Sequence, residues 1–159
     1  MPEAAPDRRL RIAVIGHAEH VTIGRLPALP AEGDIAHLAP AVGAGDAPEV
    51  IAGGGGAIAF SQLARSPGDA HFFTALGNDD AAAAVREALA ATGGAIHAAE
   101  RDEAHTRDLV IITPGGERTI FVVGEPLHPA IDDPLPWDDL ASFDAAYFTG
   151  QDPRTLEAA

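Results

Sequence analysis

Apolar runs bounded by glycine alternate along this chain with segments of helical composition. Residues 9–15 form an apolar run before Gly16, and residues 70–75 form a second run. A continuous apolar run of this length is typical of a strand buried on both faces of a parallel sheet. Each run is followed later in the chain by a segment with the composition of a helix, residues 58–65 and residues 79–91. The alternation of strands and helices predicts an α/β fold.

Two other regions predict strands outside that sheet. Between residues 17 and 51 the apolar pieces are short and are separated by prolines and glycines, which is typical of short strands and turns. Residues 109–113 and 119–123 flank a Pro-Gly-Gly-Glu turn and predict a hairpin. We expect this hairpin to join the earlier short strands in a flap or lid.

The last part of the chain predicts a return to the main sheet. Residues 137–141 indicate a short helix, residues 145–149 a third buried strand, and Asp152-Pro153 the start of a further helix. Aromatic residues inside strand-like runs are expected in the core. They are Phe72, Phe73, Phe121, Phe143, Tyr147 and Phe148.

Composition narrows the class of ligand. The 159 residues include 24 acidic and 10 basic side chains, for a net charge of -14, which disfavours nucleic acids and anionic membranes as partners. No apolar stretch approaches the ~20 residues of a membrane span, and the absence of cysteine excludes disulfides and thiolate chemistry. We therefore expect a cytoplasmic protein whose partner is a small molecule.

The glycine run Gly53-Gly54-Gly55-Gly56 is the strongest candidate for a ligand contact. It follows an apolar segment and leads directly into a helix, so it would let the backbone approach a ligand and would present unpaired N–H groups to it. A flexible turn would have the same composition. Asp79 and Asp80 have a different interpretation, since they are placed to cap the next helix.

The order of these parts resembles the ribokinase-like, or PfkB, family of sugar and nucleoside kinases. The resemblance is carried by the strand before Gly16, the lid-like segment Leu29 to Asp34, the glycine run, and the turn Gly77-Asn78-Asp79-Asp80. Residues 115–119 are similar to the second lid hairpin of that family. The resemblance implies a three-layer fold with a parallel central sheet and a small β lid, incomplete at the C-terminus. The lid strands would lie at about 17–51 and 105–124.

The resemblance covers only the N-terminal half of a typical family member. Residues 1–159 would be the N-terminal portion of one domain, and ATP and Mg²⁺ would bind mostly outside this chain. In the family the catalytic aspartate lies in a Gly-Ala-Gly-Asp motif at a helix N-terminus in the other half. Residues 43–46 spell that motif, but they lie in the flap with no buried strand before them, so we assign no catalytic residue to this chain.

Substrate residues are carried over position by position. Polar residues that hold sugar hydroxyls in the family are replaced here by Val21, Ile58 and, as a polar substitute, Gln151, which indicates a less polar substrate or a degenerate site. Glu19 lies just beyond the first strand, where open α/β sheets bind ligands, and could accept substrate hydroxyls. The expected substrate-binding residues are Glu19, Val21, Gly53, Gly54, Gly55, Ile58 and Gln151.

Two arginines and two histidines have weaker interpretations. Arg107 and Arg118 lie on the lid strands, where they could clamp an anionic group or simply be solvated. His17 and His20 flank Glu19, but this spacing without a further convergent ligand is insufficient for a metal site, and we predict none.

The expected function is ATP-dependent phosphorylation of a sugar or nucleoside-like hydroxyl, represented by its substrate-binding half and inactive alone. The main alternative is a non-catalytic binding or dimerisation module, because family lids contribute to dimer contacts and half a fold exposes a sheet edge. A dinucleotide-binding protein is a further alternative, although the required glycine spacing fails at Ile58.

Overall fold

A four-stranded parallel sheet forms the body of the molecule. The structure is a computed structural model that describes residues 9–40, 49–150 and 153–158. Its body sheet has the order β6 (Ala95–Glu100), β5 (Asp69–Leu76), β1 (Arg11–Gly16) and β9 (Ala145–Thr149), with every neighbouring pair parallel. This confirms the α/β fold with a parallel central sheet.

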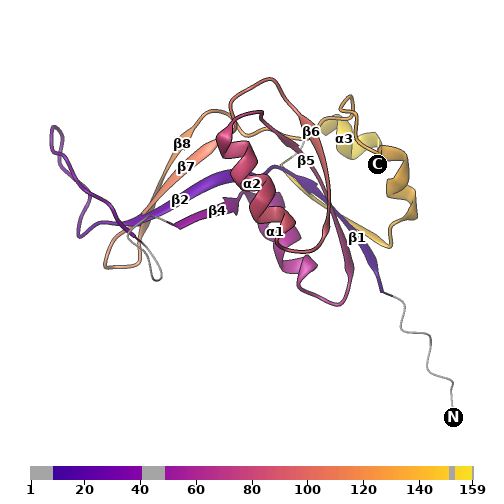
Figure 1. Cartoon of the computed structure of the whole chain (residues 1–159), viewed down its shortest axis with the longest axis horizontal. Helices are drawn as coiled ribbons and strands as arrows, with labels where there is room; N and C mark the ends of the chain where they lie inside the picture. The colour runs from indigo at the N-terminus through magenta and orange to yellow at the C-terminus, as the bar shows by residue number, and fades with distance from the viewer. Residues whose placement is uncertain (1–8, 41–48, 151–152, 159) are drawn as a thin grey trace, which may run out of the picture.

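Side chains on the two faces of the body sheet enter two separate cores. Because side chains alternate along a strand, Val14 and Phe72 face one side while Ile15 and Phe73 face the other. Helices α1 (Gly55–Ala64) and α2 (Asp80–Ala90) cover the first face, as Figure 1 shows. The 3₁₀ helix η1 (Trp137–Ser142) and the segment before it cover the second. The body is therefore three layers thick.

A second sheet projects from the body and forms the lid (Figure 1). Its central strand, β2 (Glu19–Arg25), pairs in parallel with β7 (Arg107–Ile112) on one edge. The other edge pairs antiparallel with β3 (Ala39–Pro40) and β4 (Glu49–Gly53). Strand β8 (Arg118–Val123) completes the predicted hairpin with β7 and forms the outer edge. The hairpin joins the earlier short strands, as expected.

The C-terminal elements follow the predicted order with one change of type. The predicted helix at 137–141 forms as the 3₁₀ helix η1, and α3 (Pro153–Ala158) follows β9. Among the described residues, no helix is long and apolar enough to cross a membrane. Residues 43–46, which spell the decoy motif, lie outside the described residues.

Two expectations about strands are wrong. Strand β6 was not predicted, because its sequence Ala-Ile-His-Ala-Ala-Glu has no apolar run and no regular alternation. Strand β9 is not a third buried strand: it is the fourth strand of the sheet, lies at its edge, and leaves residues 145–147 exposed. An apolar run indicates that both faces of a strand are packed against other residues. For β9, the described residues provide only part of that packing.

Two aromatic residues expected in the core lie at the surface. Phe121 is 51% exposed on β8 and Tyr147 is 50% exposed on β9. Both belong to edge strands, where no further strand or helix of the described chain packs over them. By contrast, Phe72 and Phe73 on the interior strand β5 are fully buried, as predicted.

Candidate functional site

Three segments converge tightly at the carboxyl end of β1. A Cβ atom added to Gly16 would lie 2.4 Å from the carbonyl oxygen of Thr149, and one added to Gly56 would lie 2.7 Å from that of His17. Neither position accepts a side chain, so these glycines allow β1, β9 and the start of α1 to touch. The carboxyl edge of a parallel sheet is where open α/β folds bind ligands.

The glycine run is already engaged within the protein. Gly54 has φ 83° and begins α1, a conformation that other residues rarely adopt. The N–H of Gly55 donates to Nε2 of His17 over 3.4 Å, and the N–H of Ala57 donates to the His17 carbonyl over 3.3 Å. A contact of Gly53, Gly54 or Gly55 with substrate remains a prediction, but the first amides of the helix are occupied by His17.

Two carboxyl groups meet beside His17. Glu19 begins β2, and Asp108 lies on the neighbouring strand β7, where it is 8% exposed. Burial, and then the close approach and negative charge of Asp108, raise the pKa of Glu19 to about 7. Oδ1 of Asp108 is buried and has no hydrogen-bond partner. Glu19 is therefore about half protonated at pH 7 and mostly protonated at pH 6.

His17 belongs to the same cluster but does not neutralise it. Its Nε2 lies 3.6 Å from Oε1 of Glu19, and burial and the nearby His128 lower its pKa below the ordinary value. Because Nε2 accepts the Gly55 N–H, the ring proton is placed on Nδ1 and the ring is neutral. At neutral pH, His17 is therefore not a permanent cationic partner for Glu19.

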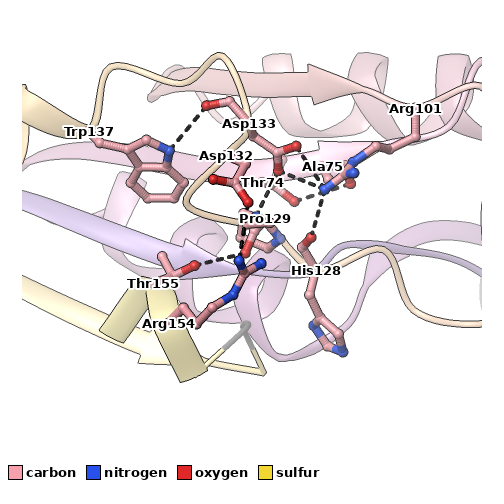
Figure 2. Close-up of polar contacts among 11 residues, drawn as sticks. Thr74, Ala75, Arg101, His128, Pro129, Asp132, Asp133, Trp137, Arg154 and Thr155 are labelled. Atoms are coloured by element: carbon pink, nitrogen blue, oxygen red, sulfur yellow. Dashed lines mark hydrogen bonds and ion pairs between the residues drawn. The ribbon is translucent and has the colours of Figure 1, made fainter. Parts of the chain in front are cut away.

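A polar network holds His128 against the site (Figure 2). Nη2 of Arg101 lies 2.8 Å from both carboxylate oxygens of Asp133 and donates to the His128 carbonyl over 3.5 Å. Asp133 also accepts the N–H of Ala130 over 2.7 Å. The His128 ring points away from this network in Figure 2 and packs edge-on against His17, with 5.0 Å between ring centroids.

Arg107 lies in a second cluster that ties the lid to α2. Its guanidinium bridges Asp79 at 2.9 Å and Asp80 at 2.8 Å. Asp79 also caps α2, since its carboxylate accepts the N–H of Ala82, and the helix amide and Arg107 outweigh burial and lower its pKa. His105 in the same cluster has a lowered pKa because of burial. The capping role predicted for Asp79 is confirmed.

The remaining predicted residues have different environments. Val21 is buried on β2 and packs beside Gly53, whose added Cβ would lie 2.2 Å from its Cγ2. Ile58 is 55% exposed and lines a groove between β4, α1 and α2. Arg118 is exposed at the start of β8, and Gln151 lies outside the described residues.

Sequence reasoning missed Asp108 and His128. Asp108 directly precedes the apolar run of β7, and its place at the start of that strand could have identified it. His128 stands in an irregular segment, and no sequence pattern places it beside His17. Among the described residues, no group of three or more His, Cys, Asp or Glu side chains could hold a metal ion.

Both long helices have N-terminal amides that are already bonded within the protein. At the start of α1 two N–H groups donate to His17, and at the start of α2 two N–H groups donate to the carboxylates of Asp79 and Asp80. A phosphate at α2 would meet two negative charges. The starts of α1 and α2 are therefore poor candidates for the site of a nucleoside triphosphate.

Comparison with known proteins gives a consistent result. A family model described as pfkB family carbohydrate kinase matches residues 10–159, whereas no curated protein matches the chain. A putative ribokinase from Agrobacterium tumefaciens is 22% identical with a TM-score of 0.71, over 89% of this chain and 44% of that one. A ribokinase from Cryptococcus neoformans in complex with ADP is 19% identical with a TM-score of 0.66, over 95% of this chain and 45% of that one. The tetrameric inhibited form of phosphofructokinase-2 from Escherichia coli is 15% identical with a TM-score of 0.67, over 95% and 51%. The chain thus spans about half the length of these similar structures, and its fold is ribokinase-like.

Proposed function

The chain belongs to the pfkB family of carbohydrate kinases, and from that membership we propose that it forms the substrate-binding half of an ATP-dependent small-molecule kinase. The substrate would be a sugar or nucleoside-like molecule with a hydroxyl group that accepts phosphate. The observation that carries the proposal is the polar cluster of Glu19, Asp108 and His17 at the carboxyl edge of the body sheet, beside the base of the lid.

ATP and Mg²⁺ would bind outside this chain. Membership of the family implies the use of ATP, but the described helix N-termini are occupied by His17, Asp79 and Asp80. The cluster also lacks a candidate for the catalytic aspartate at a helix N-terminus. This chain would bind and orient the acceptor molecule, and the other half of the fold would supply the base and the nucleotide site.

Catalysis is the direct test. The purified chain should release no ADP above the enzyme-free rate when it is incubated with Mg²⁺, ATP and a panel of sugars and nucleosides. Members of the same panel should nevertheless raise its melting temperature. ADP release that depends on both the chain and a sugar would overturn the proposed division of labour, and the absence of any stabilising ligand would overturn the substrate-binding role.

The coding DNA beyond codon 159 gives an independent test. We expect a continuation, in frame or after a frameshift, that encodes a strand followed by Gly-x-Gly-Asp and a helix. Co-expression of that segment with residues 1–159 should then restore sugar-dependent ADP release. A stop codon with no such segment in any frame would favour a non-catalytic binding module.

We also propose a homodimer through the lid. Four successive apolar residues of β8, Ile120 to Val123, are between 46% and 63% exposed, and β8 is the outer edge of its sheet. An exposed apolar edge strand is suited to pairing with a second copy. Val122→Lys should convert a dimer to a monomer in light scattering, whereas Leu156→Lys on α3, where Leu156 is 54% exposed, should not. A wild-type monomer at all concentrations would contradict the dimer.

The dinucleotide-binding alternative loses support. It requires the amides at the start of α1 to face a pyrophosphate, and they are bonded to His17.

A further inference from the structure

The lid supplies a carboxylate at a position where β2 has lost one. The resemblance to sugar kinases places an aspartate at the position of Val21, and Val21 pairs directly with Asp108 of β7. Paired residues on adjacent strands project from the same face of a sheet, and Glu19 projects from that face because it lies two residues before Val21. The expectation of a less polar site, drawn from Val21 and Ile58, therefore neglects Asp108.

In the part of the chain that the structure describes, the pair has no permanent cationic partner. His17 is neutral because its Nε2 accepts an N–H and its pKa is lowered by burial, and His128 packs against it ring to ring. Arg107 and His20 lie one residue away from Asp108 and Glu19 and so project from the opposite face. Arg107 is also committed to the acidic cap of α2.

The unpartnered oxygen of Asp108 points to a ligand. A carboxylate that is 8% exposed normally satisfies both oxygens, yet Oδ1 is buried without a hydrogen bond, and Glu19 is only 13% exposed. Two acidic groups pressed together in this way would attract a donor that carries positive charge more strongly than a neutral hydroxyl.

We propose that Glu19 and Asp108 recognise a protonated amine on the acceptor molecule, so that the substrate is an amino sugar or a similar amino polyol. The inference rests on the proposed function, because it names the substrate class of the same site. The ammonium group would donate to one oxygen of each carboxylate. Its charge would replace the proton that Glu19 holds in the free protein below pH 7.

The proton balance gives a signature that separates an amine from a hydroxyl. Below the Glu19 pKa of about 7 the free pair holds one proton. Binding of R–NH₃⁺ leaves both carboxylates ionised, and the proton of Glu19 passes to solvent. A neutral sugar would leave that proton on Glu19, so its binding would release none.

Calorimetric titration at about pH 6 tests this with pairs of sugars that differ only in one group. The probes are glucosamine with glucose, galactosamine with galactose, and mannosamine with mannose, each titrated in two buffers of different ionisation enthalpy. At least one amino sugar should bind on the order of tenfold more tightly than its parent and should release close to one proton. N-acetylglucosamine, a neutral amide, should show no such gain.

Three variants assign the effect to the pair. Asp108→Asn should remove the preference for the amine, and Glu19→Gln should remove the proton release while the amine still binds. Asp138→Asn deletes an exposed carboxylate on η1 and should change neither quantity. Circular dichroism verifies that each variant is folded. If Asp108→Asn does not fold, the proton count of Glu19→Gln still decides the question.

The contrary outcomes are distinct. Equal or tighter binding of the neutral sugars, or amine binding without proton release in the wild type, would overturn the amine proposal and leave the substrate-binding role intact. Failure of every amino and neutral sugar to bind, together with the absence of any stabilising ligand in the wider panel, would overturn both.

Discussion

The body sheet and the lid sheet are built from similarly apolar strands but bury them to very different degrees. Val14, Phe72 and Phe73 in the body are fully buried, whereas Phe121 and Val123 in the lid are 51% and 63% exposed. The body packs α1, α2 and η1 over its two faces, and β8 has a strand on one edge only. An apolar strand thus predicts a surface that is shielded from water. A ligand or another chain can provide that shielding as well as the rest of the same chain.

Truncation of one phenylalanine in each sheet should produce the largest contrast. Phe73→Ala should lower the free energy of unfolding by about 3–5 kcal/mol, because it opens a cavity in a fully packed core. Phe121→Ala should cost less than ~1 kcal/mol in the monomer, since half of the side chain is already in water. Urea unfolding followed by circular dichroism measures both. Similar costs at the two positions would show that the lid is covered in solution.

Two neighbouring aspartates extend the comparison of buried and exposed side chains to the segment before η1, which packs on the body sheet. Asp133→Ala should cost about 3 kcal/mol, because its side chain is 7% exposed and its loss leaves Arg101 and the Ala130 amide unpaired. Asp132→Ala is the matched control, since Asp132 is 78% exposed in its ion pair with Arg154 and should contribute ~0–1 kcal/mol. Thermal melts of the two variants give the answer. Equal losses of stability would contradict the role assigned to the Arg101 network.

Glu19 should make the base of the lid sensitive to alkaline pH. Its pKa is about 7 in the folded chain and near 4.5 when exposed, so the folded state holds the proton more tightly between those values. Its contribution to stability is complete below about pH 4.5 and is lost as pH rises through 7. Glu19→Gln should therefore be more stable than wild type by about 1–2 kcal/mol at pH 8 and show no such gain near pH 4.5. A gain that is equal at both pH values would contradict the buried carboxyl pair.

The body should show the opposite pH dependence, to a smaller extent. Burial, and then the neighbouring His71 at 3.0 Å, lower the pKa of His97, so the unfolded chain binds the proton more readily. Its contribution should fall by about 1 kcal/mol as pH drops below the unfolded pKa of 6.5. In a Glu19→Gln background, His97→Gln should reduce this loss of stability at acid pH. Urea titrations at several pH values measure the free energy of unfolding on which the comparison rests. If the loss of stability at acid pH were unchanged in the variant, it would be assigned to other histidines.

The sequence was sufficient to predict what depends on local pattern. Apolar runs identified β1 and β5, the Pro-Gly-Gly-Glu turn identified the β7–β8 hairpin, and Asp79 was correctly interpreted as a helix cap. Strand β6 was missed because its pairing with β5 is set by the sheet and not by its own alternation. The edge position of β9 could not be predicted, since an apolar run does not show which strands will lie beside it in the sheet.

The site was predicted only in part for the same reason. Glu19 was identified from its place after a buried strand, but its partner Asp108 comes from a strand about 90 residues later in the chain. The meeting depends on the parallel register of β2 and β7. The bond between the Gly55 N–H and His17 could not be predicted, because it depends on the path of the chain after β1, and a contact of the glycine run with a ligand stays a prediction.

Side-by-side binding of sugar and nucleotide to the isolated chain tests the central claim most directly. Calorimetric titration with the panel of sugars and amino sugars, and separately with Mg²⁺ and ATP, measures whether the two sites are divided between halves of the fold. We predict saturable binding of at least one sugar, lost or weakened in Asp108→Asn, and no detectable binding of ATP. Tight binding of ATP without binding of any sugar would contradict the account, because it would place the nucleotide site in this half of the molecule.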